Sequence, residues 1–139
     1  MPAAQLLDGA LRPPFPVSGR DHVRGSDKSS IFLLEYGDYD CPRCRAAHPL
    51  IEELREALGD ELAFVYRHFP IASVHPNALL AAEAAEAADR QGKFWDMHDG
   101  LMARDPLRPR DILALADELD LDMEAFRSAI ASGVARARI

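Results

Sequence analysis

The sequence predicts an α/β fold in which a strand–helix–strand unit is followed by a region built only of helices. Two apolar runs of strand length, at residues 31–36 and 62–69, flank a segment whose apolar residues recur at helical spacing. Runs this uniformly apolar are typical of strands covered on both faces of a sheet. A strand, a helix and a second strand over this distance predict parallel strands with a right-handed crossover.

The first thirty residues are rich in proline, glycine, serine and charged side chains. We interpret them as an arm that includes a short edge strand near Asp21–Arg24. The first long strand is expected at Ile31–Tyr36, and Gly37 and Asp38 should end it. The arm therefore precedes the predicted core.

The next segment predicts a helix that begins at the cysteines. Pro42 suits the first helical turn, where its missing N–H group costs nothing, and Gly59 is a natural stop. Pro49 lies inside the helix and is expected to kink or split it. The apolar residues at helical spacing, which predict its buried face, are Leu50, Ile51, Leu54, Ala57 and Leu58.

The second strand, Leu62–Phe69, should end at Pro70, and the rest of the chain predicts helices. In the first expected helix, Asn77–Arg90, a solvated face is assigned to Glu83, Glu86 and Asp89. The aromatic residues and methionine near Phe94 are interpreted as core. The expected helices are Asn77–Arg90, Phe94–Met102, Asp111–Leu119 and a last one capped by Asp122.

Composition favours a single domain with one core. The chain has 139 residues, of which 48% are hydrophobic, and a formal net charge of −7 from 16 basic and 23 acidic residues. This acidity argues against a nucleic-acid partner, for which a basic face is expected. Neither a signal peptide nor a run of about 20 apolar residues is recognisable, so we expect a cytoplasmic protein without a membrane partner.

Only two cysteines occur, Cys41 and Cys44. A disulfide closing so short a loop removes little chain entropy, so stabilisation is a poor reason for the pair. Cys41 follows a buried strand at the start of a helix, where backbone N–H groups and the helix dipole favour a thiolate, and Arg43 adds positive charge. Cys44, one turn later, suits the resolving role. The pattern predicts a redox dithiol.

Zinc binding is the alternative use of a close cysteine pair. A structural zinc site commonly needs a second close pair of ligands, and the sequence offers none. His48, four residues beyond Cys44, is the histidine best placed to approach the same helix face. We therefore expect no metal. The remaining histidines, interpreted as surface or loop residues, are His22, His68, His75 and His98.

Glu35 is the only charged residue in the first apolar strand and lies six residues before Cys41. A carboxyl group there should be partly buried with a raised pKa, and it would then be able to relay protons for the cysteines. A strand-end residue that reaches solvent is the alternative. The position of Glu35 in the sequence favours neither the proton relay nor the strand-end residue.

The residues around the cysteines resemble the active-site signature of DsbA-like thioredoxin-fold proteins. The similar segments are Leu34–Cys44, Tyr66–Pro70, His75–Pro76, Ala81–Ala85 and Gly92–Asp99, and Asp21–Gly25 resembles the pre-strand segment, including versions fused to sodium/proton antiporters. The resemblance implies a thioredoxin-like core with a helical insertion. It also implies that Cys41 is the nucleophile, that Cys44 resolves the mixed disulfide, and that Glu35 occupies the buried acidic position. It implies no cofactor, since the dithiol itself carries the electrons.

Composition and the resemblance together predict an arm at 1–25 and a partial thioredoxin-like domain at 26–139, within which residues 75–139 form the helical insertion. In the family a cis-proline loop, two strands and a helix follow the insertion, whereas this sequence stops at Ile139 with Pro109 as its last proline. We therefore expect a domain without the C-terminal strand–strand–helix part. We also expect Leu62–Phe69 to form an apolar sheet edge that lacks its usual partner strands. The N-terminal arm, a second copy of the chain or aggregation would then cover it, and a symmetric dimer is the most economical of these solutions.

Two functions follow, from different classes. The first is a thiol–disulfide oxidoreductase that acts through Cys41-Pro42-Arg43-Cys44 on protein thiols and an unidentified redox partner. The second is a pseudoenzyme or interaction module with little turnover. The two differ in whether the dithiol still catalyses disulfide exchange.

Overall fold

The computed structural model describes residues 17–139, which form two compact units. The sheet unit comprises the residues up to Tyr36 together with Pro49–Arg67, and the helical unit comprises Gly37–His48 and His68–Ile139. Residues 1–16 of the predicted arm lie outside the described residues.

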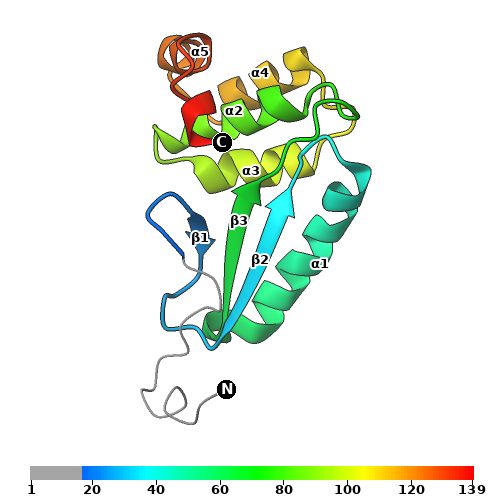
Figure 1. Cartoon of the computed structure of the whole chain (residues 1–139), viewed down its shortest axis with the longest axis vertical. Helices are drawn as coiled ribbons and strands as arrows, with labels where there is room; N and C mark the ends of the chain where they lie inside the picture. Colours follow the sequence, from blue (N-terminus) through cyan, green and yellow to red (C-terminus); the bar gives the residue numbers. More distant parts are fainter. Residues whose placement is uncertain (1–16) are drawn as a thin grey trace. The chain divides into compact units, whose positions relative to one another are not determined.

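The sheet has three strands in the order β1-β3-β2 (Figure 1). The strands are β1 (His22–Arg24), β2 (Ile31–Gly37) and β3 (Leu62–His68). β1 is the short strand expected within the arm, and it runs antiparallel to β3 with Val23 opposite Val65. The arrows of β2 and β3 point the same way in Figure 1, which confirms the predicted parallel pair.

β3 is the central strand and not the edge that the sequence led us to expect. Residues Leu62–Tyr66 are all buried, because β1 pairs with one side of β3 and β2 with the other. Among the described residues the two edge strands of the sheet are therefore the short β1 and the longer β2. The exposed edge expected at Leu62–Phe69 is wrong, and of the three covers considered from the sequence it is the N-terminal arm, through β1, that pairs with β3.

Gly25 allows the chain to turn closely over the start of β3. Its φ of +122° lies in a region that L side chains rarely adopt, and a Cβ atom there would lie 2.8 Å from the carbonyl oxygen of Leu62. The short strand β1 can therefore pair with β3 only if this position has no side chain.

The predicted helix is α1 (Pro42–Leu58), which is followed by the short 3-10 helix η2 (Gly59–Glu61). α1 runs through Pro49 without interruption, so the split considered from the sequence does not occur. Of the apolar residues expected on its buried face, Ile51 is buried, whereas Leu50 and Leu54 are 60% and 48% exposed.

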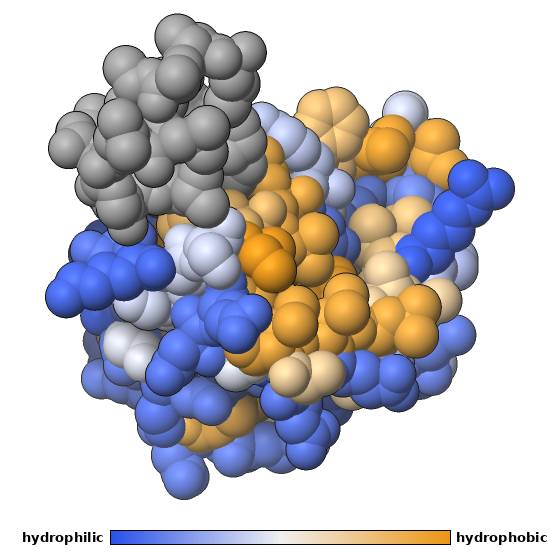
Figure 2. All heavy atoms as spheres, turned by 90° about the horizontal axis from the view of Figure 1, so that it is seen from below, coloured by the Kyte–Doolittle hydropathy of each residue, from blue (hydrophilic) through white to orange (hydrophobic). Residues whose placement is uncertain are grey.

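Apolar side chains remain on the surface of the sheet unit. Ile31 and Tyr36 on β2 are exposed, as are Leu50 and Leu54 on α1. Figure 2 shows apolar residues gathered on the face of the molecule that is seen from below. Exposed apolar side chains are thus present on β2 and α1 of the sheet unit, whereas pairing between two copies of the chain stays a prediction.

The helical unit is arranged around α2 (Ala78–Asp89), which packs against each of the later helices. The predicted cap at Asp122 is confirmed, because its carboxylate accepts a 3.0 Å hydrogen bond from the Ala125 amide at the start of α5. The helix expected from Asp111 begins two residues earlier, with Pro109 in its first turn. The later elements are α3 (Phe94–Met102), α4 (Pro109–Glu118), α5 (Met123–Ala131) and the 3-10 helix η3 (Arg136–Arg138).

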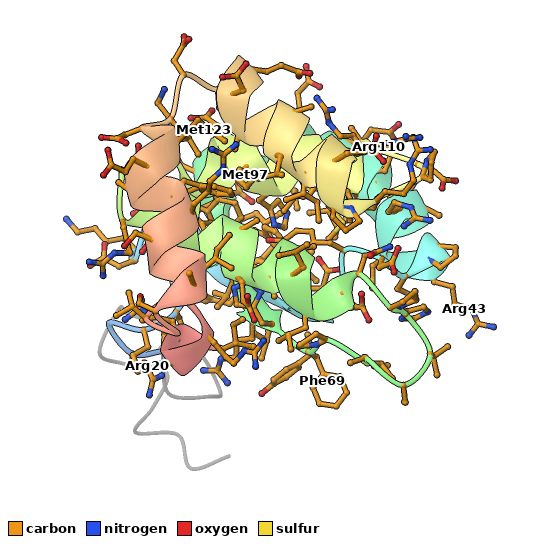
Figure 3. The ribbon with its side chains drawn as sticks, turned by 90° about the horizontal axis from the view of Figure 1, so that it is seen from above. Arg20, Arg43, Phe69, Met97, Arg110 and Met123 are labelled. Atoms are coloured by element: carbon orange, nitrogen blue, oxygen red, sulfur yellow. The ribbon has the colours of Figure 1, made fainter. Side chains whose placement is uncertain are left out.

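α2 is buried along almost its whole length, because alanine side chains let the neighbouring helices approach from several sides. Met97 of α3 is fully buried and lies among the helices in Figure 3, which confirms that this methionine belongs to the core. Gly100 allows a close approach, since a Cβ atom there would lie 2.6 Å from the Leu115 side chain of α4.

Glu83 and Glu86 of α2 are buried, so their interpretation as a solvated face was wrong. Glu83 is 4% exposed and forms a 2.6 Å ion pair with Arg136. Glu86 is 2% exposed and lies 2.9 Å from His68 Nε2 and 3.4 Å from Arg138 Nε. Arg136 and Arg138 thus place positive charge beside two carboxylates whose burial would be costly without such partners.

No helix within residues 17–139 combines the length and the apolar character that a bilayer crossing requires.

Replacing Arg136 by Met should destabilise the protein by about 1–3 kcal/mol, because it leaves the buried Glu83 carboxylate without its cation. Adding Glu83→Gln to that variant should recover much of the loss, since the buried charge is then gone. Urea unfolding of the single and double variants measures both effects.

The matched control is Arg127→Met, which changes an exposed arginine of α5. It should alter the free energy of unfolding by less than about 0.5 kcal/mol. Equal small losses for Arg136→Met and Arg127→Met would show that the Glu83 ion pair contributes little.

Candidate active site

Cys41 lies at the residue immediately before α1. Its carbonyl oxygen accepts a 3.1 Å hydrogen bond from the Arg45 amide, and its own amide donates to the Asp38 carbonyl at 3.1 Å. These bonds place Cys41 at the N-cap, where several amide N–H groups have no acceptor within the helix. The side chain at this position lies at the positive end of the helix dipole.

The first turn of α1 brings together four of the five predicted site residues. Pro42 is the first helical residue, and Cys44 completes the turn. Both cysteines are free thiols and half-buried. Arg43 is exposed, and Figure 3 shows its side chain extending outward. Glu35, the fifth predicted residue, belongs to β2 in the sheet unit.

The Asp38 side chain fixes the loop that precedes Cys41. It is 4% exposed, and its Oδ1 atom accepts a 2.9 Å hydrogen bond from the Asp40 amide. Oδ2 lies 2.8 Å from His75 Nδ1 and accepts a 3.0 Å bond from the Ile71 amide. One carboxylate thus joins the loop before α1 to the segment that follows β3.

Asp40 forms a second connection from the same loop. Its Oδ2 atom accepts a 3.0 Å hydrogen bond from the Asn77 amide, just before α2. Arg45 lies 3.7 Å from the other Asp40 oxygen and donates to the Tyr39 carbonyl oxygen at 3.2 Å. The loop is therefore held on both sides of Tyr39.

Sequence analysis did not identify Asp38, Asp40, Arg45 or His75 as residues that build the site. Two aspartates within the three residues before Cys41 were the available signal, because short acidic side chains often accept hydrogen bonds from nearby loop amides. The partners in the segment after β3 could not be identified from spacing alone.

Tyr39 points into a buried group of aromatic and histidine side chains in the helical unit. Its hydroxyl lies 2.9 Å from His98 Nδ1, and its ring packs edge-on against His68 and His98. Phe94 and Trp95 pack against His98 at ring-centre distances of 5.9 and 5.0 Å. The interpretation of the histidines as surface or loop residues was wrong for His98, which is fully buried, for His68, whose side chain on β3 is 4% exposed, and for His22, which is buried on β1.

The segment after β3 exposes three large apolar side chains. Phe69 is 59% exposed, Ile71 is 40% exposed and Val74 is 68% exposed. Figure 3 shows Phe69 directed outward. Because Asp38 binds the Ile71 amide, this apolar segment is attached to the loop that carries Cys41.

Burial raises the pKa of Glu35 from 4.5 to about 7. The cause is loss of solvation of the charged carboxylate, since the side chain is half-buried on an apolar strand. The sequence-based expectation of a partly buried acid is therefore confirmed. A group with this pKa exchanges protons readily near neutral pH.

Comparison with known proteins agrees with this architecture. A family model described as Thioredoxin matches residues 17–139. A thioredoxin-like oxidoreductase from Silicibacter pomeroyi has a solved structure that is 30% identical, with a TM-score of 0.78 over 88% of this chain and 69% of that one. The match to the family model covers every described residue.

A second relative carries a different name. A protein named Na(+)/H(+) antiporter NhaA 1 from Salinispora arenicola is 47% identical over 121 residues. The match covers 86% of this chain but 18% of that protein. The chain thus spans about a fifth of the length of the curated relatives it matches, and it corresponds to their thioredoxin-like region.

The fold is also that of the thiol-disulfide exchange protein alpha-DsbA2 from Wolbachia pipientis. The two share a TM-score of 0.70 at 22% identity, over 82% of this chain and 61% of the other. These matches confirm the resemblance to DsbA-like proteins that the sequence indicated. The chain belongs to the thioredoxin family.

Proposed function

We propose that the chain is a thiol–disulfide oxidoreductase that exchanges disulfides with protein thiols through Cys41 and Cys44. The observation that carries the proposal is the place of Cys41 at the N-cap of α1, with Cys44 one turn later. A helix N-terminus favours the thiolate, which is the form that attacks disulfides. The family and the oxidoreductase named among its relatives support the same chemistry.

The exchange takes place in two steps. The Cys41 thiolate attacks one sulfur of a substrate disulfide, a mixed disulfide forms, and the other substrate sulfur leaves as a thiolate. Cys44 then loses its proton and attacks the Cys41 sulfur, which releases the second substrate thiol. The substrate gains two electrons and the chain acquires a Cys41–Cys44 disulfide. The reverse steps oxidise a substrate dithiol.

Arg43 supports the first step through its charge. It lies between the two cysteines on the exposed side of the first turn, where a guanidinium group stabilises a nearby anion. Its exposure also places it where an approaching acidic or polar substrate would meet it.

Exposed apolar residues next to the loop support a polypeptide substrate. Phe69, Ile71 and Val74 present apolar surface on a segment that Asp38 ties to the Cys41 loop. Apolar side chains of this size contribute to binding when a partner covers them. The same surface supports the alternative of an interaction module, which would bind polypeptides without turnover.

We retain Glu35 as the group that accepts and returns protons during exchange. Its place six residues before Cys41 and its pKa of about 7 support this role, because a base with a pKa near the working pH is the most effective. The proton lost by Cys44 in the second step is the one it would accept.

The antiporter names of the curated relatives belong to proteins about five times as long as the matched segment. We therefore do not extend ion transport to these 139 residues. We propose disulfide exchange for the matched segment on the evidence of its own cysteines and of its family.

Cys41 should be alkylated faster than Cys44, because the helix N-terminus favours its thiolate. Iodoacetamide reaction rates between pH 5 and pH 9 should be compared in Cys44→Ser and Cys41→Ser proteins, each of which retains one thiol. Reduction of insulin should be abolished in the Cys41→Ser protein, whereas Cys44→Ser should accumulate the mixed disulfide.

Faster alkylation of Cys44, or insulin reduction that survives loss of Cys41, would refute the assigned roles. Capture of reduced polypeptides without any disulfide exchange by the unaltered protein would favour the interaction module.

Replacing Glu35 by Gln should stabilise the protein at pH 8. Between pH 4.5 and pH 7 the folded carboxyl keeps a proton that the unfolded chain has lost, so stability falls as pH rises through this interval. The change in pKa from 4.5 to about 7 corresponds to roughly 3 kcal/mol as an upper value. Urea unfolding at several pH values should show this slope in the unaltered protein and not in Glu35→Gln.

The same variant should exchange disulfides more slowly near pH 7, because the proton acceptor is absent. Glu53→Gln, which alters an exposed carboxylate of α1, is the matched control and should change neither property. An unchanged exchange rate and pH profile in Glu35→Gln would restrict Glu35 to a structural position.

A further inference from the structure

A histidine pair and a carboxylate meet in the helical unit, next to the aromatic group around Tyr39. His48 lies on α1, and His98 and Asp99 are consecutive on α3. One potential ligand atom of each residue lies within 4.8 Å of the other two. The residues come from segments fifty positions apart, so the sequence spacing gave no sign of the cluster.

We propose that His48, His98 and Asp99 bind a divalent transition-metal ion of the zinc class. Two imidazoles and one carboxylate are a donor set that zinc accepts, with a fourth position left for water or another ligand. Nothing in the proposed exchange of disulfides uses these three residues.

The distances suit a small tetrahedral ion. His48 Nε2 lies 3.6 Å from Asp99 Oδ1. Zinc–nitrogen and zinc–oxygen bonds of about 2.0–2.1 Å at tetrahedral angles separate two ligands by about 3.4 Å. The two imidazole rings have centres 5.4 Å apart and are inclined at 66°, so small side-chain rotations bring both rings to one ion.

The surroundings of His98 are those of a metal ligand. The Tyr39 hydroxyl lies 2.9 Å from Nδ1, and such a bond fixes both the ring orientation and the tautomer. When Nδ1 donates to the Tyr39 oxygen, Nε2 is the nitrogen that coordinates. Phe94 and Trp95 supply an apolar shell on the buried side.

The remaining ligands provide access from solvent. The His48 side chain is 13% exposed and that of Asp99 is 40% exposed, whereas His98 is fully buried. The site is therefore anchored at His98 and open at Asp99, which gives an ion a route of entry. A bound ion would fasten the first half of α1 to α3.

The test is zinc binding by the full chain carrying Cys41→Ser and Cys44→Ser, measured by competition with a chromogenic chelator. We expect one zinc ion per chain. His48→Gln and Asp99→Asn should each weaken binding by at least about 100-fold, and Tyr39→Phe should weaken it by about 10-fold. Circular dichroism should show that each variant is folded, and His98 is left unaltered because it is buried.

Asp96→Asn is the matched control, because Asp96 is an exposed carboxylate on the same helix, three residues before Asp99. It should bind zinc as the parent does. Cobalt substituted for zinc should give visible ligand-field bands without sulfur-to-cobalt charge transfer, even when both cysteines are present.

Three results would overturn the proposal. They are the absence of stoichiometric zinc in the cysteine-free chain, unchanged affinity in both His48→Gln and Asp99→Asn, or a sulfur-to-cobalt band in the unaltered protein, which would assign the ion to the dithiol. None of these outcomes bears on the disulfide-exchange activity, which is measured separately.

Discussion

The buried carboxylate of Asp38 is the constraint on which the candidate active site depends. A carboxylate that is withdrawn from water must accept hydrogen bonds to remain charged at low cost. Asp38 has bonds to the Asp40 and Ile71 amides and to the His75 ring. The position of the loop before α1 is therefore determined by groups on a distant segment of the chain.

Successive residues of this loop reach three different parts of the helical unit. Asp38 binds the segment after β3, Tyr39 contacts His98 on α3, and Asp40 accepts from the amide before α2. A loop held at each residue has little freedom, so Cys41 meets a substrate with its helix N-terminus already formed. Pre-organisation of this kind lowers the entropy lost on reaching the transition state.

Local patterns in the sequence predicted most of the elements. The two apolar strands, the start of α1 at the cysteines, α3 and the Asp122 cap follow from periodicity and capping rules, which depend on neighbouring residues. Errors arose where distant segments meet. β3 is a central strand because β1 pairs with it, whereas the sequence left the cover of β3 open. Glu83 and Glu86 of α2 are buried, and the arginines that pair with them lie more than fifty residues later in the chain.

In the candidate site, too, the features set by neighbouring residues were predicted, whereas those set by contacts between distant residues were not. A close cysteine pair before a helix is readable from spacing, and so is a lone carboxylate at Glu35. The Asp38 bonds and the His48–His98 contact join residues 33 to 50 positions apart, and no local pattern encodes such pairings. Tertiary structure alone brings these residues together.

The most direct test of the redox account is equilibration of the protein with glutathione buffers of graded potential, followed by acid quenching, alkylation and mass spectrometry. The account predicts a single two-electron transition in which the reduced chain loses two hydrogens and a disulfide joins Cys41 to Cys44. Persistence of both thiols across the range would contradict it, as would glutathione adducts on both cysteines without an intramolecular disulfide.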